Sequence, residues 1–268
     1  MRRSDRLVAL THYFIENPRE HTPLPVFRER FQSAKSSISE DLVIVDEILK
    51  LEGLGYLERN PGAGGGVKYI PLYSKEHSFH FIDGLCDTLE DPARMLPGGY
   101  LYMSDLLGNP KTVREIGRIF AAKFSDVPID AVITVATKGI PLAYAVASFL
   151  NVPVVIVRRD PKVTEGSSVS INYVSGSSRK IQTMVLPKRG LEDGANVCII
   201  DDFMKAGGTI SGMTSLLSEF QANVNAIGVL AEADDEEDER TVKDYTSLVK
   251  IKNMDMKQNS IEVTRGNL

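Results

Sequence analysis

The fold of this chain can be read from one segment, Val197-Cys198-Ile199-Ile200-Asp201-Asp202-Phe203-Met204-Lys205-Ala206-Gly207-Gly208-Thr209-Ile210. Its apolar start predicts a buried strand, which delivers the carboxylates of Asp201 and Asp202 at its C-terminal end. Ligands of open α/β sheets bind at that end of the strands. The following turn, Ala206 to Thr209, begins a predicted helix, and its small residues let backbone N–H groups close around an anion. Carboxylates suit vicinal hydroxyls and N–H groups suit a phosphate, so the segment predicts a site for a ribose 5-phosphate.

Other interpretations of these residues are less specific. Two aspartates after a strand are often a solvated turn, and paired glycines are often a plain helix entry, but their combination in this order favours a ligand site. The G-x-x-x-x-G-K-[ST] spacing of a Walker loop is absent. A dinucleotide fingerprint is excluded as well, because Gly207 and Gly208 are adjacent and follow the acidic residues.

Strands alternate with helices on both sides of this segment. Such an alternation predicts a parallel sheet that is covered by helices. The segment 159–180 is polar and rich in Gly and Ser, and connections of that length are functional lids or disordered segments. Apolar runs predict strands at 131–135, 152–157, 196–200 and 226–231, with helices through 142–149 and 210–220.

The first 73 residues follow a different pattern. Three predicted helices and a glycine-tipped hairpin in this length are typical of a winged helix-turn-helix. We therefore expect a winged-helix domain at 1–73, a connector with one helix at 74–99, and an α/β domain with helices on both faces of its sheet at 100–268. The three helices are predicted at 7–14, at 25–31 beginning with Pro25, and from the capping box Ser37-Ile38-Ser39-Glu40 up to Gly53. The two extended arms of the hairpin are predicted at 56–59 and 67–70.

Composition limits the class of protein. Of the 268 residues, 43% are hydrophobic and 25% are charged, which is typical of a globular protein with a sizeable core. No run approaches the ~20 consecutive apolar residues that a membrane span needs, and the N-terminus lacks the pattern of a signal peptide. Cys86 and Cys198 form neither a disulfide framework nor a metal-ligand pattern. These features predict a reduced, cytoplasmic protein with no membrane partner and no metal site.

Charge is distributed unevenly between the two predicted domains. The net charge of the chain is −5, whereas residues 1–73 hold 10 Lys or Arg and 10 Asp or Glu. Global charge alone argues against a nucleic-acid binder, so any binding of DNA must come from a local patch.

Val197–Thr209 resembles the phosphoribosyl pyrophosphate (PRPP) signature of type I phosphoribosyltransferases. The whole chain resembles the purine operon regulators of Gram-positive bacteria, in which a winged-helix domain is fused to a type I phosphoribosyltransferase-like domain. The resemblance implies that this fold is used to bind an effector and that catalysis is lost. The matching runs are 33–42, 61–71, 96–100, 134–143 and 170–177.

The resemblance also assigns an effector site. It implies that Asp201 and Asp202 contact the ribose hydroxyls, that 205–209 surrounds the 5-phosphate, and that 136–139 is a loop for the pyrophosphate. Without the resemblance to this family, Lys138 would be interpreted as a solvated lysine at the start of a helix. The implied effector-binding residues are Asp201, Asp202, Phe203, Met204, Lys205, Ala206, Gly207, Gly208, Thr209, Ala136, Thr137, Lys138 and Gly139.

Five further residues are weaker candidates for the effector site. Arg158, Arg159 and Lys162 precede or belong to the segment that matches the family's flexible loop, and a solvated basic loop is the alternative for each. Tyr100 and Tyr102 stand at the first strand of the α/β domain, where they border the site or pack in the core.

The DNA-binding residues are predicted from the winged-helix pattern. The third helix would enter the major groove with its N-terminal residues first, and hydroxyls and basic groups there can contact phosphates or base edges. A solvated surface is the alternative for each residue. The candidates are Lys35, Ser36, Ser37 and Ser39 on that helix, Arg2, Arg3 and Arg6 at the N-terminus, and Gly64, Gly65, Gly66 and Lys68 on the wing.

These inferences combine into one predicted function with an alternative. We expect a homodimeric DNA-binding transcription regulator of purine biosynthesis and salvage genes, which binds double-stranded operator DNA and senses PRPP without catalysis. We expect no obligatory cofactor. The sequence leaves open whether Mg²⁺ accompanies PRPP and whether other phosphorylated nucleotides compete with it. It also leaves open whether the protein is a repressor or an activator. The alternative is an active purine phosphoribosyltransferase with an appended DNA-binding domain, which would need a nucleobase pocket. A plain DNA-binding repressor would leave Asp201 and Asp202 beside 206–209 unexplained.

Overall fold

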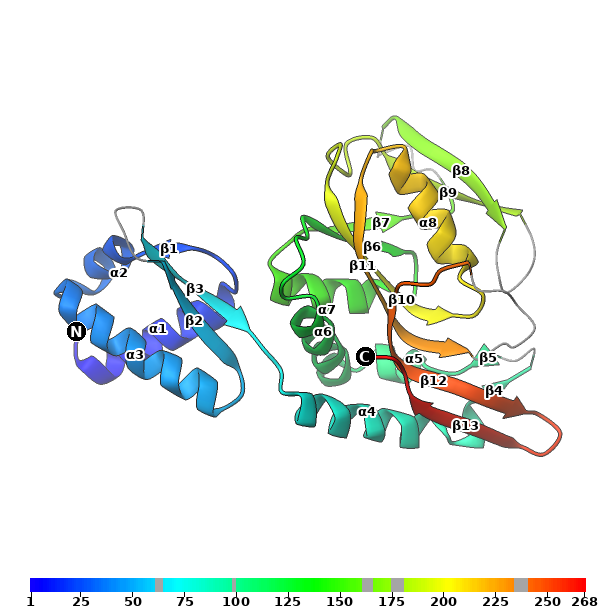
Figure 1. The fold of residues 1–268 in the computed structure, drawn as a ribbon, viewed down its shortest axis with the longest axis horizontal. Helices are drawn as coiled ribbons and strands as arrows, with labels where there is room; N and C mark the ends of the chain where they lie inside the picture. The colour runs from blue at the N-terminus through cyan, green and yellow to red at the C-terminus, as the bar shows by residue number, and fades with distance from the viewer. Residues whose placement is uncertain (61–64, 98–99, 161–165, 175–180, 234–240) are drawn as a thin grey trace.

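The computed structural model describes residues 1–60, 65–97, 100–160, 166–174, 181–233 and 241–268. The chain forms two bodies, which are joined by an extended segment that leads into α4 (Lys75–Leu89) (Figure 1). The smaller body holds the N-terminus, and the larger body is built around a twisted sheet. Among the described helices, none is both long and apolar enough to cross a membrane.

The N-terminal body has the predicted winged-helix architecture. Its three-stranded sheet has the order β1-β3-β2, and a single core joins the sheet to the three helices. Phe14 and Phe27 are fully buried there, with ring centroids 5.5 Å apart. Its elements are α1 (Arg3–Glu16), β1 (Thr22–Pro23), α2 (Leu24–Phe31), α3 (Lys35–Leu51), β2 (Gly55–Asn60) and β3 (Gly66–Pro71).

The start of α3 differs from the sequence prediction. The capping box placed this start near Ser37, but the helix already begins at Lys35, and Ala34 at the N-cap position provides no side-chain hydrogen bond. The helix thus begins one or two residues earlier than predicted, and Gln32 ends α2 in the left-handed conformation. Ser36 and Ser37 therefore lie in the first turn of α3.

The larger body contains a six-stranded sheet of order β13-β12-β11-β10-β6-β7. Five strands are parallel, and β13 is antiparallel to β12, which the alternation of strands and helices did not predict. The strands are β6 (Ala131–Val135), β7 (Val154–Val157), β10 (Asn196–Met204), β11 (Asn223–Ala233), β12 (Thr246–Asp255) and β13 (Ser260–Arg265).

Each face of this sheet has its own hydrophobic core. Alternate residues of β10 point to opposite faces, so that Cys198 and Ile200 belong to one core and Val197 and Ile199 to the other. Helices α4, α6 and α7 cover the first face, and α8 with a β-hairpin covers the second. The covering elements are α6 (Pro110–Lys123), α7 (Ile140–Leu150), α8 (Gly208–Ser218), β8 (Ser168–Val174) and β9 (Ile181–Pro187).

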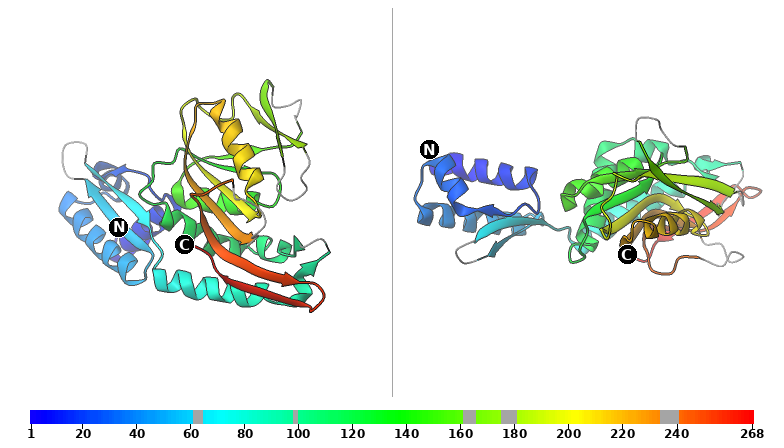
Figure 2. Two further views of the ribbon diagram at one scale, coloured as in Figure 1. Left: turned by 45° about the vertical axis from the view of Figure 1, so that its right-hand side comes forward. Right: turned by 90° about the horizontal axis from the view of Figure 1, so that it is seen from above.

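The helix predicted in the connector is present as α4, whereas the segment predicted as a lid or a disordered loop contains a strand. Helix α4 runs beside β12 and β13 (Figure 2), and Arg265 on β13 bonds Asp83 on α4 through two guanidinium nitrogens. Within 159–180, residues 168–174 form β8, which pairs with β9. Short elements precede α6, namely a 3₁₀ turn (Pro92–Arg94), β4 (Met95–Leu96), β5 (Tyr100–Leu101) and α5 (Ser104–Leu107).

Helices α6 and α7 pack closely against each other at a glycine of α6. A methyl group added at Gly117 on α6 would lie 2.6 Å from both the carbonyl carbon and the Cβ of Ala145 on α7. By contrast, a methyl group at Gly84, on the exposed side of α4, would meet nothing within 4 Å. Substitutions at these two glycines therefore distinguish the effect of close helix packing from the effect of helix propensity.

We predict that Gly117→Ala lowers the free energy of unfolding by ~1–3 kcal/mol, because the added methyl group overpacks the contact between α6 and α7. Gly84→Ala is the matched control and should raise that free energy by up to ~1 kcal/mol through helix propensity. Urea denaturation measures both. Equal effects of the two substitutions would contradict the close packing at Gly117.

Candidate functional site

The predicted site lies where β10 loses one of its two neighbours. Strand β6 pairs with β10 only as far as Ile133 and Ile199, whereas β11 pairs with it as far as Met204. The chain leaves β6 toward β7 on one side and returns through β10 on the other side. Open α/β sheets bind ligands at such a switch point. Asp201 and Asp202 lie within β10 at this place, rather than after its end as predicted.

Asp201 is a buried carboxylate with an acidic neighbour. Its side chain is buried, and the backbone N–H of Asp202 donates to its Oδ1 at 2.9 Å. Burial and then the charge of Asp202 raise the pKa of Asp201 well above its ordinary value. Burial also raises the pKa of Asp202, while a hydrogen bond with Asp201 and the charge of Lys138 act against that rise. Burial thus outweighs the hydrogen bonds and the positive charges that favour the ionised form of these two carboxyls.

The loop at 136–139 packs against this aspartate pair. A methyl group at Gly139 would contact the Thr134 hydroxyl and would lie 3.1 Å from Asp201 Oδ1. The Thr134 hydroxyl is buried and has no hydrogen-bond partner among the described residues. The loop and the aspartates share a hollow of about 520 Å³, which is lined by Val135, Ala136, Thr137, Lys138, Arg158, Arg159, Asp160, Asp201, Asp202, Phe203 and Thr209.

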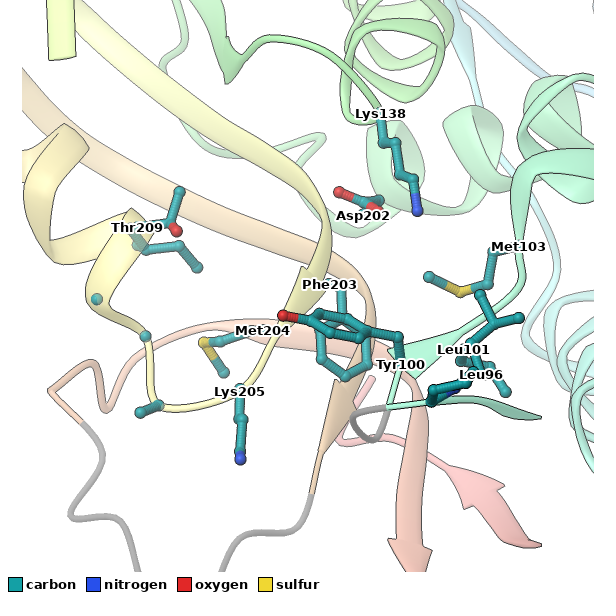
Figure 3. Close-up of a pocket in the computed structure, with 15 residues that line it drawn as sticks. Leu96, Tyr100, Leu101, Met103, Lys138, Asp202, Phe203, Met204, Lys205 and Thr209 are labelled. Carbon is teal, nitrogen blue, oxygen red and sulfur yellow. The ribbon is translucent and has the colours of Figure 1, made fainter. Parts of the chain in front are cut away.

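The turn after β10 lines a second hollow on the other side of Asp202. Gly207 has φ +84°, a conformation that favours glycine, and α8 begins at the next residue. Backbone N–H groups of a first helical turn have no partner within the helix and can bind an anion. Figure 3 shows Lys138 and Asp202 on one side of this hollow and Thr209 across from them. Its volume is about 470 Å³, and 203–210 supplies much of its lining.

The opposite wall of this hollow comes from residues that sequence reasoning largely missed. Tyr100 is 54% exposed and lines the hollow, so the core-packing alternative is wrong for this residue. Tyr102 is 45% exposed, does not line either hollow, and is not a core residue. The signals in the sequence were the closeness of the missed residues to Tyr100 and, for two of them, the matching run 96–100. They are Leu96, Pro97, Leu101 and Met103.

Most of the predicted effector residues are thus brought together. Residues of the β10 segment and of the loop at 136–139 line one or both hollows, except that Gly139 lies behind the loop against Asp201. Arg158 and Arg159 line the hollow beside the loop. Lys162 lies outside the described residues.

The predicted DNA-binding residues of α3 lie together at its N-terminus. Lys35 and Ser36 are exposed, and Ser37 and Ser39 are half-buried. A shallow hollow at the turn before α3 is lined by Arg28, Gln32 and Ser33, among others. Sequence reasoning missed Arg28, although a basic residue in the last turn of α2 was visible in the sequence.

Two N-terminal arginines are bound within the domain. The carboxylate of Asp41 on α3 is fully buried and pairs with Arg3 Nε at 3.1 Å and with Arg6 Nε at 2.8 Å. The Arg6 side chain is 11% exposed. These arginines therefore fix α1 to α3, whereas Arg2 is exposed.

The wing residues differ from one another in their contacts and burial. Lys68 pairs with Glu58 on the neighbouring strand at 2.7 Å. Gly66 is buried in β3, where a methyl group would clash with His21 and the Thr22 carbonyl, so close approach of β1 explains this glycine. This burial contradicts the predicted DNA contact of Gly66. Gly65 is half-buried, and Gly64 lies outside the described residues.

Comparisons with known proteins identify the family. A family model described as bacterial purine repressor, N-terminal, matches residues 2–71, and one described as phosphoribosyl transferase domain matches residues 103–264. The purine biosynthesis transcriptional repressor PurR of Bacillus subtilis (strain 168) is 58% identical over 266 residues, which cover 99% of this chain and 93% of the relative. This chain belongs to the PurR family of purine biosynthesis transcriptional regulators.

The PurR family contains proteins named for opposite effects on transcription. The purine biosynthesis transcriptional activator PurR of Lactococcus lactis subsp. lactis (strain IL1403) is 44% identical over 268 residues, which cover 100% of this chain and 98% of the relative. Among solved structures, an adenine phosphoribosyltransferase from Thermoanaerobacter pseudethanolicus matches with a TM-score of 0.54 and 20% identity, covering 62% of this chain and 98% of that chain. These findings confirm the predicted family and the phosphoribosyltransferase-like fold of the larger domain.

We predict that Asp201→Asn stabilises the PurR-family chain at pH 7. The folded protein holds a proton on Asp201 at pH values where the unfolded chain has lost it, so stability falls as pH rises between the ordinary and the raised pKa. The amide removes this cost but still accepts the N–H bond of Asp202. Urea denaturation should therefore show a higher midpoint for the variant at pH 7 and a shrinking difference as the pH falls toward the ordinary aspartate range. Asp193→Asn removes an exposed charge and is the control. A difference that does not depend on pH would contradict the explanation.

We also predict that Arg6→Ala lowers the free energy of unfolding by about 2–4 kcal/mol, because it leaves the buried charge of Asp41 with Arg3 alone. Arg2→Ala removes an exposed arginine from the same segment and should change that free energy by less than ~0.5 kcal/mol. Denaturation curves of the two variants test the assignment, which would fail if both lost the same stability.

Proposed function

We propose that this chain, as a homodimer, binds operator DNA of purine genes and uses PRPP as its effector. One observation supports the proposal most strongly. Two carboxyls whose pKa values burial raises, Asp201 and Asp202, line a hollow that Lys138, Arg158 and Arg159 also line, and Asp202 also lines the hollow at the turn before α8.

The chemistry of PRPP matches this arrangement group by group. Its vicinal hydroxyls would donate to the aspartate pair, which needs donors to keep its charge while buried. Its 5-phosphate would occupy the turn at 205–209 and the first turn of α8. Its pyrophosphate would lie in the hollow that Lys138, Arg158 and Arg159 line, since basic groups stabilise phosphates.

A divalent cation would fit this scheme as a companion of the ligand. In the described part of the chain, no group of three or more His, Cys, Asp or Glu side chains is placed to hold a metal ion by itself. Mg²⁺ typically keeps several waters and is bound by one or two carboxylates together with substrate phosphates. Asp201, Asp202 and the ligand's own pyrophosphate would supply such a set, so assays with PRPP need arms with and without Mg²⁺.

Sensing requires that PRPP bind the DNA-competent and the DNA-incompetent states with different affinities. The effector hollows and the first turn of α3 belong to different domains. A change in the contact between the domains, or between the two copies in the dimer, would carry the difference. The direction of the effect follows from which state binds PRPP more tightly.

A second candidate function is favoured by the apolar wall of the hollow. Tyr100, Leu101 and Phe203 line a space of about 470 Å³ next to the aspartate pair, where a planar base could stack. A purine phosphoribosyltransferase would use such a space for its nucleobase. Incubation of the protein with PRPP, Mg²⁺ and each purine base distinguishes the two functions. We expect no nucleotide, and turnover would support the enzyme.

We predict that changing Asp201 and Asp202 to alanine abolishes the effect of PRPP on the operator Kd and leaves the operator Kd without PRPP within about twofold. The reason is that the substitutions remove the acceptors for the ribose hydroxyls and lie outside the winged-helix domain. Fluorescence anisotropy with labelled operator at a stated salt concentration measures both values. A double variant that still responds to PRPP would refute the assignment of the effector site.

A further inference from the structure

The winged-helix domain and the larger domain meet along α6. Arg118 on α6 donates from Nη2 to the carbonyl of Gly53 at 3.2 Å. Arg19, in the winged-helix domain, donates from Nη1 to the carbonyl of Ser125 just beyond α6 at 3.1 Å. Each domain therefore donates an arginine hydrogen bond to a backbone carbonyl of the other domain.

Tyr73 lies at the point where the chain passes from one domain to the other. The guanidinium of Arg118 lies 4.6 Å from the centroid of its ring. Burial and then the neighbouring carboxylate of Glu115 raise the pKa of Tyr73 to about 12. Glu115 and Arg118 are three positions apart on α6, so they are neighbours on one side of the helix. Both side chains of α6 thus lie near Tyr73, at the point where the chain passes between the domains.

The same part of α6 contacts the effector site through α7. Gly117, between Glu115 and Arg118, packs directly on Ala145 of α7 without an intervening side chain. Helix α7 begins at Ile140, immediately after the loop at 136–139. A shift of α7 when an anion binds that loop would therefore be transmitted to α6, because close-packed helices move together or repack.

The junction leaves part of its hydrogen-bonding capacity unused. Arg19 Nε, Arg19 Nη2 and Glu115 Oε2 are buried and have no partner among the residues that the structure describes. The same junction holds a cavity of about 530 Å³, which Tyr73 lines and to which both domains contribute, with Gly53 and Tyr56 from one and Ile119 and Ala122 from the other. Buried polar groups normally have partners. A cavity and unpartnered polar groups at one junction leave room for the two domains to repack against each other.

We propose that Arg118, Glu115 and Tyr73 form a coupling clamp, which ties the orientation of the winged-helix domain to the position of α6 and hence to the occupancy of the effector site. These are positioning residues, since they contact neither DNA nor effector in this scheme. The inference rests on the proposed function, because it concerns how PRPP binding reaches the DNA-binding domain.

The test uses the full chain and compares the operator Kd with and without saturating PRPP. For Arg118→Gln and for the milder Tyr73→Phe, the ratio of the two operator Kd values should fall at least fivefold relative to the unmodified chain. The PRPP Kd of the DNA-free protein, measured by calorimetry, should stay within threefold. Reciprocity requires that the effect of operator DNA on the PRPP Kd fall by the same factor, which a merely structural role would not produce. Arg118→Lys keeps the charge and a donor and should restore part of the ratio.

Lys111→Gln is the matched control, because it removes one exposed charge from the first turn of the same helix and should keep the full ratio. Retention of the full ratio in both Arg118→Gln and Tyr73→Phe would overturn the clamp, and Tyr73→Phe decides alone if Arg118→Gln does not fold. An unmodified chain whose operator Kd ignores PRPP would instead overturn the proposed function, and the clamp with it.

Discussion

The arrangement of the larger domain depends on keeping the carboxylate of Asp201 buried beside that of Asp202. Two like charges in a poorly solvated place are unfavourable, and burial is the main cause of the raised pKa of both groups. The sheet imposes this cost because β10 continues along β11 after its pairing with β6 has ended. Strand β10 is therefore open toward β6 at the place where both carboxyls lie.

The winged-helix domain handles a buried carboxylate in the opposite way. Asp41 is as deeply buried as Asp201, but the guanidinium groups of Arg3 and Arg6 neutralise it within the fold. These two ion pairs connect α1 to α3. Burial instead leaves Asp201 with a raised pKa.

Local patterns in the sequence predicted most of the architecture. The apolar run before Asp201 and the glycine that needs a positive φ at 207 specify a strand, a turn and a helix from neighbouring residues alone, and the helical spacing of the first segment did the same for the winged helix. Features that depend on distant residues were missed. Arg6 and Asp41 are 35 positions apart, and the wall at Leu96 and Met103 reaches the site only through the fold. The hairpin of β8 and β9 was also missed. Val169, Ile171 and Tyr173 alternate with polar residues along β8, but the Gly and Ser content of 159–180 favoured a loop.

Calorimetric titration of PRPP into the full chain, in the presence and absence of Mg²⁺, tests the central claim most directly. The account predicts saturable heat with one site per chain, and loss of that heat when Asp201 and Asp202 are both alanine. Absence of saturable binding to the unmodified chain, or equal binding by the double variant, would contradict it.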